Sequence, residues 1–188
     1  MDLVREGRPA SIQEAADRAL VSVATAYRYF PSADDLWWEA SVSLIDYQPA
    51  VAEAFERVEA AGSNPQARLE ALIRVIGFEM LDDQAPFRRI AKIALEQWLN
   101  QVDVPQVEKV PIRQGRRNDQ IRKVIEPLKD ELTKKDIDRI AHALGLVIGT
   151  ESMIALIDGV GLDVPTSKKA LLDASRWLLA GALAELSE

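Results

Sequence analysis

The 188-residue chain contains no cysteine and only one histidine, His142. The absence of cysteine excludes disulfides and thiolate metal sites and is consistent with a reducing compartment, so we expect a cytoplasmic protein. His142 lies between Ile140 and Leu144 on an apolar stretch, which is more typical of a packing residue than of a metal ligand or a catalytic base. No paired carboxylates, phosphate-binding glycine loop or nucleophile motif can be recognised elsewhere in the sequence. The sequence therefore predicts a protein that is not an enzyme and that binds no metal or cofactor.

Long hydrophobic runs are also missing. No segment approaches the roughly 18 consecutive apolar residues of a membrane span. The first ten residues, MDLVREGRPA, lack the apolar run of a signal peptide. We therefore expect no association with a membrane.

Positive charge is in the minority, because 23 Lys and Arg residues stand against 30 Asp and Glu residues, for a formal net charge of -7. Such an acidic chain is not expected to bind polyanions non-specifically. A small face of the protein can still bind DNA, since salt screens exposed charges over about 10 Å.

What the sequence does contain is helical periodicity along almost its whole length. Apolar residues recur at i, i+3, i+4 and i+7 spacing, and no alternating strand pattern is present. The sequence predicts an all-α fold, with a small headpiece over residues 1–40 and a larger helical domain over residues 41–188. Residues 100–117, which include two prolines, are expected to form a linker within the larger domain.

The headpiece contains two short helices with a tight connection, which we expect over Ile12–Ala19 and Val23–Phe30. Ser11 and Glu14 have the spacing of a capping box, and Ser22 is a suitable N-cap for the second helix. This arrangement predicts a helix-turn-helix motif, in which the second helix enters the major groove of DNA. The alternative is a plain helical hairpin whose aromatic residues pack internally.

The second helix of such a motif has to present two faces. Ala26 and Phe30, at i and i+4, can face the small core, and Pro31 then ends the helix. Ser32 and Asp35 repeat the capping-box spacing at the start of the next helix. Tyrosine hydroxyls and an arginine guanidinium are suited to phosphates and base edges. The residues expected to point outward are Thr25, Arg28 and Tyr29, with Tyr27 at the edge.

The segment SIQEAADRALVSVATAYRYFPSADDL resembles the DNA-binding region of the TetR family of bacterial transcriptional regulators. The shared pattern is an alanine-rich helix, a Val-Ser turn, Thr-x-Tyr-x-Tyr-Phe, Pro-Ser, and an acidic start to the next helix. The resemblance implies a homodimeric, ligand-released repressor that binds double-stranded operator DNA. It implies a DNA-facing set formed by Ser22, Val23, Thr25, Tyr27, Arg28 and Tyr29. The rest of the chain resembles the family's helical ligand-binding and dimerisation domain only diffusely.

Four features depart from the family pattern. Leu20 stands where the turn usually holds a glycine, and Val23-Ala24 stands where Lys-Gly or Arg-Gly is common. Ala33 and Asp34 replace a lysine that usually meets a phosphate. The family's first helix is nearly absent, so we expect a start upstream of Met1, and the alternative is a headpiece that becomes ordered only when it binds. The rival hypothesis is a TetR-like helical dimer that binds a small molecule or a protein but no longer binds DNA.

In the family the effector lies among the middle helices, and here the resemblance implies an apolar or aromatic small molecule with few polar anchors. Ordinary core packing is the alternative for each residue. The expected pocket is formed by Phe55, Phe78, Trp98, Ile121 and Leu144, with Glu151 and His142 as polar anchors.

A dimer interface is expected on the last helices. Gly145 and Gly149, four residues apart, would let another helix approach closely, and the last helix is apolar on two sides. Packing within one subunit is the alternative. The basic run at residues 113–117 is expected to be a solvated surface, with a contact to an anionic ligand or to the partner subunit as the alternative. The expected interface comprises Gly145, Gly149, Leu171, Leu178, Leu179 and Leu183.

Overall fold

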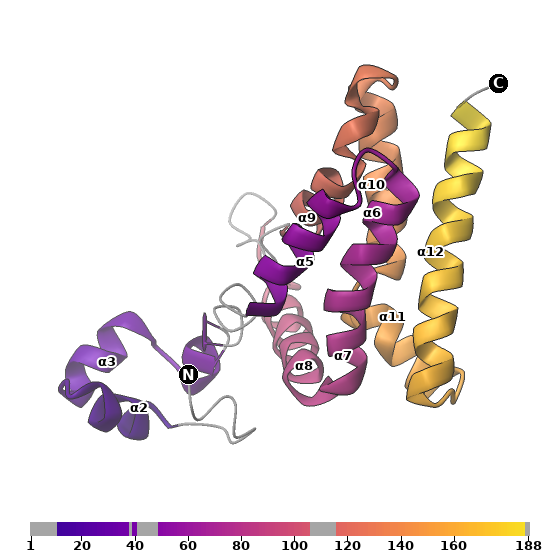
Figure 1. The fold of residues 1–188 in the computed structure, drawn as a ribbon. Coiled ribbons are helices and arrows are strands. Elements are labelled where there is room, and N and C mark those ends of the chain that lie inside the picture. The colour runs from indigo at the N-terminus through magenta and orange to yellow at the C-terminus, as the bar shows by residue number, and fades with distance from the viewer. Residues whose placement is uncertain (1–10, 38, 41–48, 106–115, 187–188) are drawn as a thin grey trace. The chain divides into compact units, whose positions relative to one another are not determined.

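The computed structural model describes residues 11–37, 39–40, 49–105 and 116–186. Within these ranges every regular element is helical and no strand occurs, so the predicted all-α fold is confirmed. The α-helices labelled in Figure 1 are α2 (Ile12–Ala19), α3 (Val23–Tyr29), α5 (Pro49–Ala60), α6 (Pro65–Leu72), α7 (Phe78–Asp82), α8 (Gln84–Asn100), α9 (Arg116–Ile125), α10 (Lys134–Val147), α11 (Thr150–Ile154) and α12 (Val164–Leu186). Residues 33–37 form a further helical segment. Single π-helical turns follow α6 (Ile73–Gly77) and α11 (Ala155–Gly159), and a 3-10 turn follows α9 (Glu126–Asp130).

The chain divides into two compact units. The first consists of the described residues within Met1–Gln48 and Ala85–Lys109, and the second of those within Pro49–Gln84 and Val110–Glu188. Almost all of α8, which the sequence analysis assigned to the larger domain, therefore belongs with α2 and α3, and Trp37 packs against Ile93 on α8. The predicted boundary after residue 40 adjoins residues 41–48, which lie outside the described residues, and it stays a prediction. Most of the predicted linker, residues 106–115, also lies outside them.

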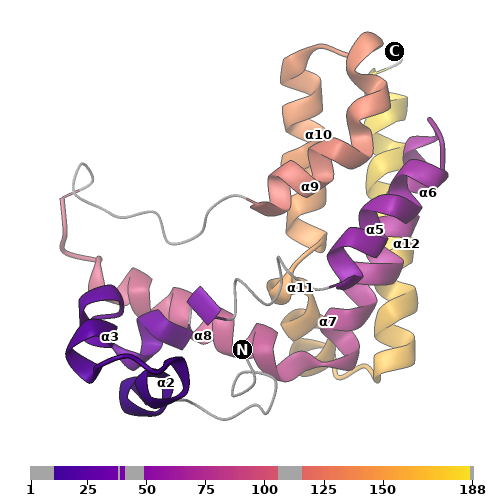
Figure 2. The same cartoon turned by 60° about the vertical axis from the view of Figure 1, so that its left-hand side comes forward.

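In the second unit, α6 is the helix around which the core forms, because it contacts α5, α9 and α12 (Figure 2). On α12 the buried residues recur at every fourth position, which turns one face of this helix toward α6 and α10. Each buried leucine contributes about 1.5–3 kcal/mol through the removal of apolar surface from water. The largest buried side chains of these helices are Leu69, Leu72, Ile121, Val124, Ile140, Leu144, Leu171 and Leu179.

The π-helical turn after α6 ends at Gly77, which is buried against α12. A Cβ atom at this position would lie 2.9 Å from Cδ2 of Leu171, closer than carbon atoms pack. Gly77 therefore sets how closely α12 approaches.

The stretch Lys134–Gly159 is long and apolar enough to cross a membrane, with a mean hydropathy of 1.8. The core helix of a globular protein has the same properties. Here the backbone leaves helical geometry at Ile148 (φ -107°, ψ 88°), and the side chains of Ile140, Leu144 and Met153 are at most 2% exposed. We interpret this stretch as two core helices, α10 and α11, that meet at a break.

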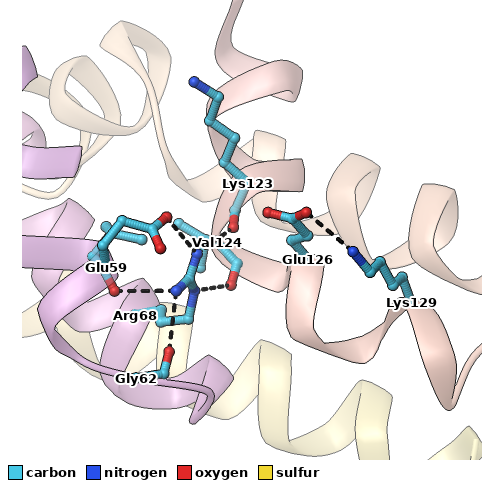
Figure 3. Close-up of polar contacts among 8 residues, drawn as sticks. Glu59, Gly62, Arg68, Lys123, Val124, Glu126 and Lys129 are labelled. Atoms are coloured by element: carbon cyan, nitrogen blue, oxygen red, sulfur yellow. Dashed lines mark hydrogen bonds and ion pairs between the residues drawn. The ribbon is translucent and has the colours of Figure 1, made fainter. Parts of the chain in front are cut away.

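Arg68 on α6 is the most deeply buried charged residue among those described, with 4% of its surface exposed. Its Nε donates to the carbonyl oxygen of Val124 (2.9 Å), and one terminal nitrogen donates to that of Lys123 (2.8 Å). The other terminal nitrogen donates to the carbonyls of Val58 (3.3 Å) and Gly62 (3.0 Å) (Figure 3). The guanidinium is therefore held mainly by backbone oxygens.

These backbone oxygens belong to the C-terminal ends of two helices. Val58 lies in the last turn of α5, and Lys123 and Val124 lie in the last turn of α9. The last carbonyls of a helix have no partner within it and carry the negative end of the helix dipole, so a cation there is favourable. Gly62, at φ 70°, turns its carbonyl to the same guanidinium in a left-handed conformation that glycine adopts readily. One side chain of α6 thus caps both α5 and α9.

Replacing Arg68 by alanine should lower the free energy of unfolding of this unit by about 3–5 kcal/mol, because buried carbonyls lose their donors and a cavity remains. Urea unfolding followed by circular dichroism measures the change. Arg74→Ala is the matched control: Arg74 pairs with Glu70 on the surface, and its removal should cost less than about 1 kcal/mol. Equal losses for the two variants would contradict the capping role of Arg68.

Candidate nucleic-acid interface

Helix α2 begins as the sequence predicts. The Ser11 hydroxyl accepts a hydrogen bond from the Glu14 amide (3.1 Å), and the Glu14 carboxylate accepts one from the Ser11 amide (3.0 Å). The predicted capping box is confirmed. Ile12 and Ala16, one turn apart, are 4% and 1% exposed and form one side of the headpiece core.

The turn between α2 and α3 depends on Leu20, which takes the left-handed conformation (φ 56°, ψ 38°). The Leu20 amide donates to Asp17 O and the Val21 amide donates to Ala16 O, so the helix end has the hydrogen bonds of a Schellman motif. Among the described residues, Leu20 is the only one other than glycine with a positive φ, and its side chain is 92% exposed. A left-handed conformation costs such a residue about 1–2 kcal/mol. The turn thus has the left-handed geometry that a glycine would adopt easily, and the backbone of Leu20 is strained as a result.

Helix α3 follows directly. The Ser22 hydroxyl accepts a hydrogen bond from the Thr25 amide (3.1 Å) and shares another with the Thr25 hydroxyl (2.7 Å), which confirms the predicted N-cap. The helix ends at Tyr29, one residue before the predicted end. Phe30 has extended backbone angles, as expected for a residue that precedes proline.

The two faces of α3 differ in burial. Ala26 is buried with Ile12 and Ala16, and Phe30 packs against this cluster, as predicted. Val23 also packs against it, whereas the sequence analysis placed Val23 in the DNA-facing set. Its side chain is partly buried against the small core, so only part of its surface remains for an outer role. The exposed side chains of α3 include Tyr27 (52%), Arg28 and Tyr29 (66%).

Arg28 and Tyr29 form a joint polar group on the exposed face. A terminal nitrogen of Arg28 donates to the Tyr29 hydroxyl (3.3 Å), and the guanidinium carbon lies 5.1 Å from the centre of the ring. Guanidinium and phenol groups are the donors that proteins direct at phosphates and base edges. The predicted second face of α3 is therefore present.

The segment after α3 opens with the predicted capping box. The Ser32 hydroxyl accepts from the Asp35 amide (3.1 Å), and the Asp35 carboxylate accepts from the Ser32 amide (3.1 Å). Ala33 and Asp34 are exposed in the first turn of this segment. Cationic side chains are therefore scarce at its start.

Trp98, one of the residues expected to line a ligand pocket, belongs to the first compact unit and is 54% exposed. The other four, and the anchor Glu151, belong to the second unit. Ile121 and Leu144 are at most 1% exposed, as the alternative of core packing predicts. The Lys123 ammonium lies 4.5 Å from the centre of the Phe55 ring.

The remaining two expected pocket residues are also engaged within the chain. The Phe78 ring is flanked by the ammonium of Lys168 at 5.0 Å and the guanidinium of Arg74 at 5.9 Å. Glu151 accepts a hydrogen bond from Arg117 (2.9 Å). His142, the other suggested anchor, is exposed on α10. Phe78 and Glu151 therefore have contacts within the chain, and the pocket stays a prediction.

The two glycines expected at a dimer interface lie against α9 of the same chain. Arg117 donates to the carbonyl of Gly145 (3.0 Å), and a Cβ atom at Gly149 would lie 2.3 Å from the guanidinium carbon of Arg117. A Cβ atom at Gly145 would lie 3.3 Å from Oδ1 of Asn118. The alternative of packing within one subunit therefore applies to both. Arg117 of the basic run therefore binds within its own chain rather than forming only a solvated surface. Residues 113–115 of this run lie outside the described residues.

The last helix uses much of its expected interface in its own core. Leu171 and Leu179 are 2% and 0% exposed, and Leu178 and Leu183 are partly buried. The exposed apolar groups here are ones that the sequence analysis did not select: Leu146 on α10 (78%) and Trp177 on α12 (70%). Whether such a residue is exposed depends on the rotation of its helix about the helix axis. In a helix that is apolar on two sides, the periodicity of the sequence does not determine this rotation.

Leu146 lies near the end of α10, and Trp177 lies in the second half of α12. Arg139 near the start of α10 pairs with Glu185 near the end of α12 (2.8 Å), so the two helices run antiparallel. Gly181, one turn after Trp177, has no neighbouring atom within 4 Å of its Cβ position. We call Leu146, Trp177 and Gly181 the α10–α12 patch.

Comparison with known proteins gives no match, whether with protein-family models, with curated proteins or with solved structures. The TetR resemblance of residues 11–36 therefore stays a prediction.

Leu20→Gly should stabilise the headpiece by about 0.5–1 kcal/mol, because the relief of the left-handed strain exceeds the entropy cost of a glycine. Hydrogen exchange of the buried Ala16 and Ala26 amides should become about two- to fivefold slower, at roughly 1.4 kcal/mol for each factor of ten. The control is Ala19→Gly in the last turn of α2, which should speed up exchange, since glycine is a poor helix former. Faster exchange in Leu20→Gly would show that the side chain has a role that the turn geometry does not explain.

Proposed function

We propose that the chain is a DNA-binding transcriptional regulator of the TetR type, a homodimeric repressor that is released from DNA by a small molecule. The observation that carries the proposal is the pair α2–α3, joined by the left-handed turn at Leu20 and closed around Ile12, Ala16 and Ala26. This core leaves the outer face of α3 to Tyr27, Arg28 and Tyr29.

In this mechanism α3 enters the major groove. The Tyr27 and Tyr29 hydroxyls donate to phosphates, and Arg28 leaves its contact with Tyr29 to reach a phosphate or a guanine edge. Ser22 and Thr25, at the N-terminal end of α3, lie where the recognition helix of a helix-turn-helix protein contacts base edges. The effector changes the separation of the two headpieces, so that they no longer match successive major grooves.

Dimerisation places two copies of α3 on half-sites about 34 Å apart, one turn of DNA. The α10–α12 patch supports this part of the proposal. A single exposed tryptophan needs no partner, but Trp177, Leu146 and an uncovered glycine on adjacent helices give a second copy of the chain a close apolar contact.

The net negative charge of residues 11–40 favours the rival function, a helical dimer without DNA binding. Arg18 and Arg28 are the only cations among residues 11–40, which carry five carboxylates, namely Glu14, Asp17, Asp34, Asp35 and Glu39. A DNA-binding headpiece is usually basic. Binding experiments distinguish the two functions.

Arg28→Ala should weaken binding to the DNA upstream of the encoding gene by about 1–3 kcal/mol and relax the preference over a shuffled duplex, if Arg28 contacts a base edge. Fluorescence anisotropy with both duplexes measures this. Arg57→Ala, which removes a surface cation of α5, is the control and should have little effect. If neither the wild-type chain nor its variants bind any duplex, the rival function holds.

The double change Ala33→Lys with Asp34→Ser should tighten binding to all sequences alike, because it adds a cation and removes a carboxylate where the family contacts a phosphate. The salt dependence should steepen by about one phosphate per subunit. A change that depends on DNA sequence would argue against a phosphate contact at this position.

Trp177→Glu should convert the dimer into monomers, because a carboxylate would be buried without a partner in the apolar contact. Sedimentation velocity at micromolar concentration reports the assembly state. Trp98→Glu, at a second tryptophan that is more than half exposed, is the matched control and should leave the sedimentation coefficient unchanged. Monomers formed by Trp98→Glu together with an unchanged dimer in Trp177→Glu would place the interface on α8 instead.

A further inference from the structure

An apolar stripe runs along the end of α8 and into the turn that follows it. Its members are Leu95 (65% exposed), Trp98 (54%), Leu99 (60%) and Val102 (51%). Their spacing is i, i+3, i+4 and i+7, which places side chains on one face of a helix. The Val102 amide donates to the carbonyl of Leu99 (3.3 Å), so the turn continues the path of the helix. We call these four residues the α8 stripe.

The α8 stripe is contiguous, which separates it from ordinary exposed apolar residues. Single exposed apolar side chains are common on protein surfaces, whereas a contiguous patch usually marks a contact with another molecule. The residues that α8 buries within its own chain precede the stripe, and they are Ile90, Ala91, Ile93 and Ala94. The end of α8 therefore presents an apolar face that its own fold does not use.

Opposite charges lie at the two ends of the stripe. Lys92 is exposed about one turn before Leu95, and Asp103 is exposed directly after Val102. Lys92 pairs with Glu96 at 3.4 Å, but an i,i+4 ion pair at the surface is weak, so the ammonium can also reach a second carboxylate. The stripe therefore has a positive end and a negative end.

This polarity makes the stripe complementary to itself in one orientation. When two stripes pack antiparallel about a two-fold axis, apolar side chains meet along the whole contact, with Trp98 opposite Leu99 at the axis. Lys92 of each copy then lies near Asp103 of the other copy. A parallel pair would instead place the two lysines together and the two aspartates together. An antiparallel pair of identical helices is an isologous contact, which is complete with two copies.

We propose that the α8 stripe binds the α8 stripe of a second copy of the chain, with the two helices antiparallel and Lys92 paired with Asp103 at each end. Four half-exposed side chains offer on the order of a few hundred Å² per copy, whereas a stable complex buries about 800 Å² per partner. The contact is therefore transient at micromolar concentration. If the chain also dimerises through the α10–α12 patch, as proposed above, the α8 stripe joins one dimer to another.

The test uses the absence of cysteine from the chain, which lets single introduced cysteines report the contact. A disulfide requires Cα atoms within about 7 Å of each other. In the antiparallel pair Leu95 of one copy lies opposite Val102 of the other. Two Leu95 residues lie roughly 10 Å apart along the axis, since seven residues of helix rise about 1.5 Å each.

A mixture of Leu95→Cys and Val102→Cys chains, one of them labelled with ¹⁵N, should therefore form the mixed disulfide at least about fivefold faster than either variant forms a disulfide with itself. Mass spectrometry of the cross-linked chains under mild oxidation measures the three rates. Asn100→Cys, which is exposed on the same helix outside the stripe, is the matched control and should cross-link slowly with every variant.

Charge reversal gives a second readout at low salt. Lys92→Glu and Asp103→Lys should each weaken the association about two- to fivefold, and the double variant should restore it, because each pair is then reversed rather than lost. Sedimentation equilibrium over a concentration series measures the association. The series is run in the Trp177→Glu background, so the result does not depend on the α10–α12 patch or on DNA binding.

Three results would overturn the proposal. Mixed cross-links that form no faster than those of Asn100→Cys would exclude the contact, and self cross-links as fast as the mixed one would exclude the antiparallel arrangement. Leu99→Glu should abolish the mixed cross-link and leave hydrogen exchange of the buried α8 amides within about twofold of the wild-type chain, since the stripe is exposed. Markedly faster exchange in this variant would show that the stripe is covered within its own chain.

Discussion

The helical body depends on one electrostatic constraint, which is that the carbonyl groups at the ends of α5 and α9 need donors in a place that is largely closed to water. Arg68 meets this constraint from α6 with a single planar group, and its hydrogen bonds join three helices. Because those partners are backbone atoms, the contact fixes where α5 and α9 end relative to α6. The leucine and isoleucine side chains between these helices pack closely within that geometry.

The headpiece has a much smaller hydrophobic core than the helical body. Its buried core consists of Ile12, Ala16 and Ala26, with Val23, Phe30 and Leu36 packed around it. Two of the three buried residues are alanines, so hydrophobic burial alone contributes little. The three serine caps, at positions 11, 22 and 32, therefore supply a large share of the local order.

These differences explain what could be predicted from the sequence. Each serine cap joins groups three residues apart, so the caps and the helices that they begin could be identified from the sequence. Arg68 and Arg117 instead bind carbonyl groups up to 56 residues away, and a carbonyl carries no side-chain signal. The contact of α9 with Gly145 and Gly149 could not be predicted for the same reason.

The contact between Arg28 and Tyr29 has a consequence for the thermodynamics of recognition. A free arginine side chain has about 2 kcal/mol of rotamer entropy, part of which is lost whenever it is fixed on a ligand. In this headpiece part of that freedom is already given up, because the guanidinium rests on the neighbouring ring. Transfer of its hydrogen bond from the phenol to another acceptor exchanges one ordered state for another. Association through this face is therefore expected to show a smaller unfavourable side-chain entropy than an extended, unrestrained arginine would give.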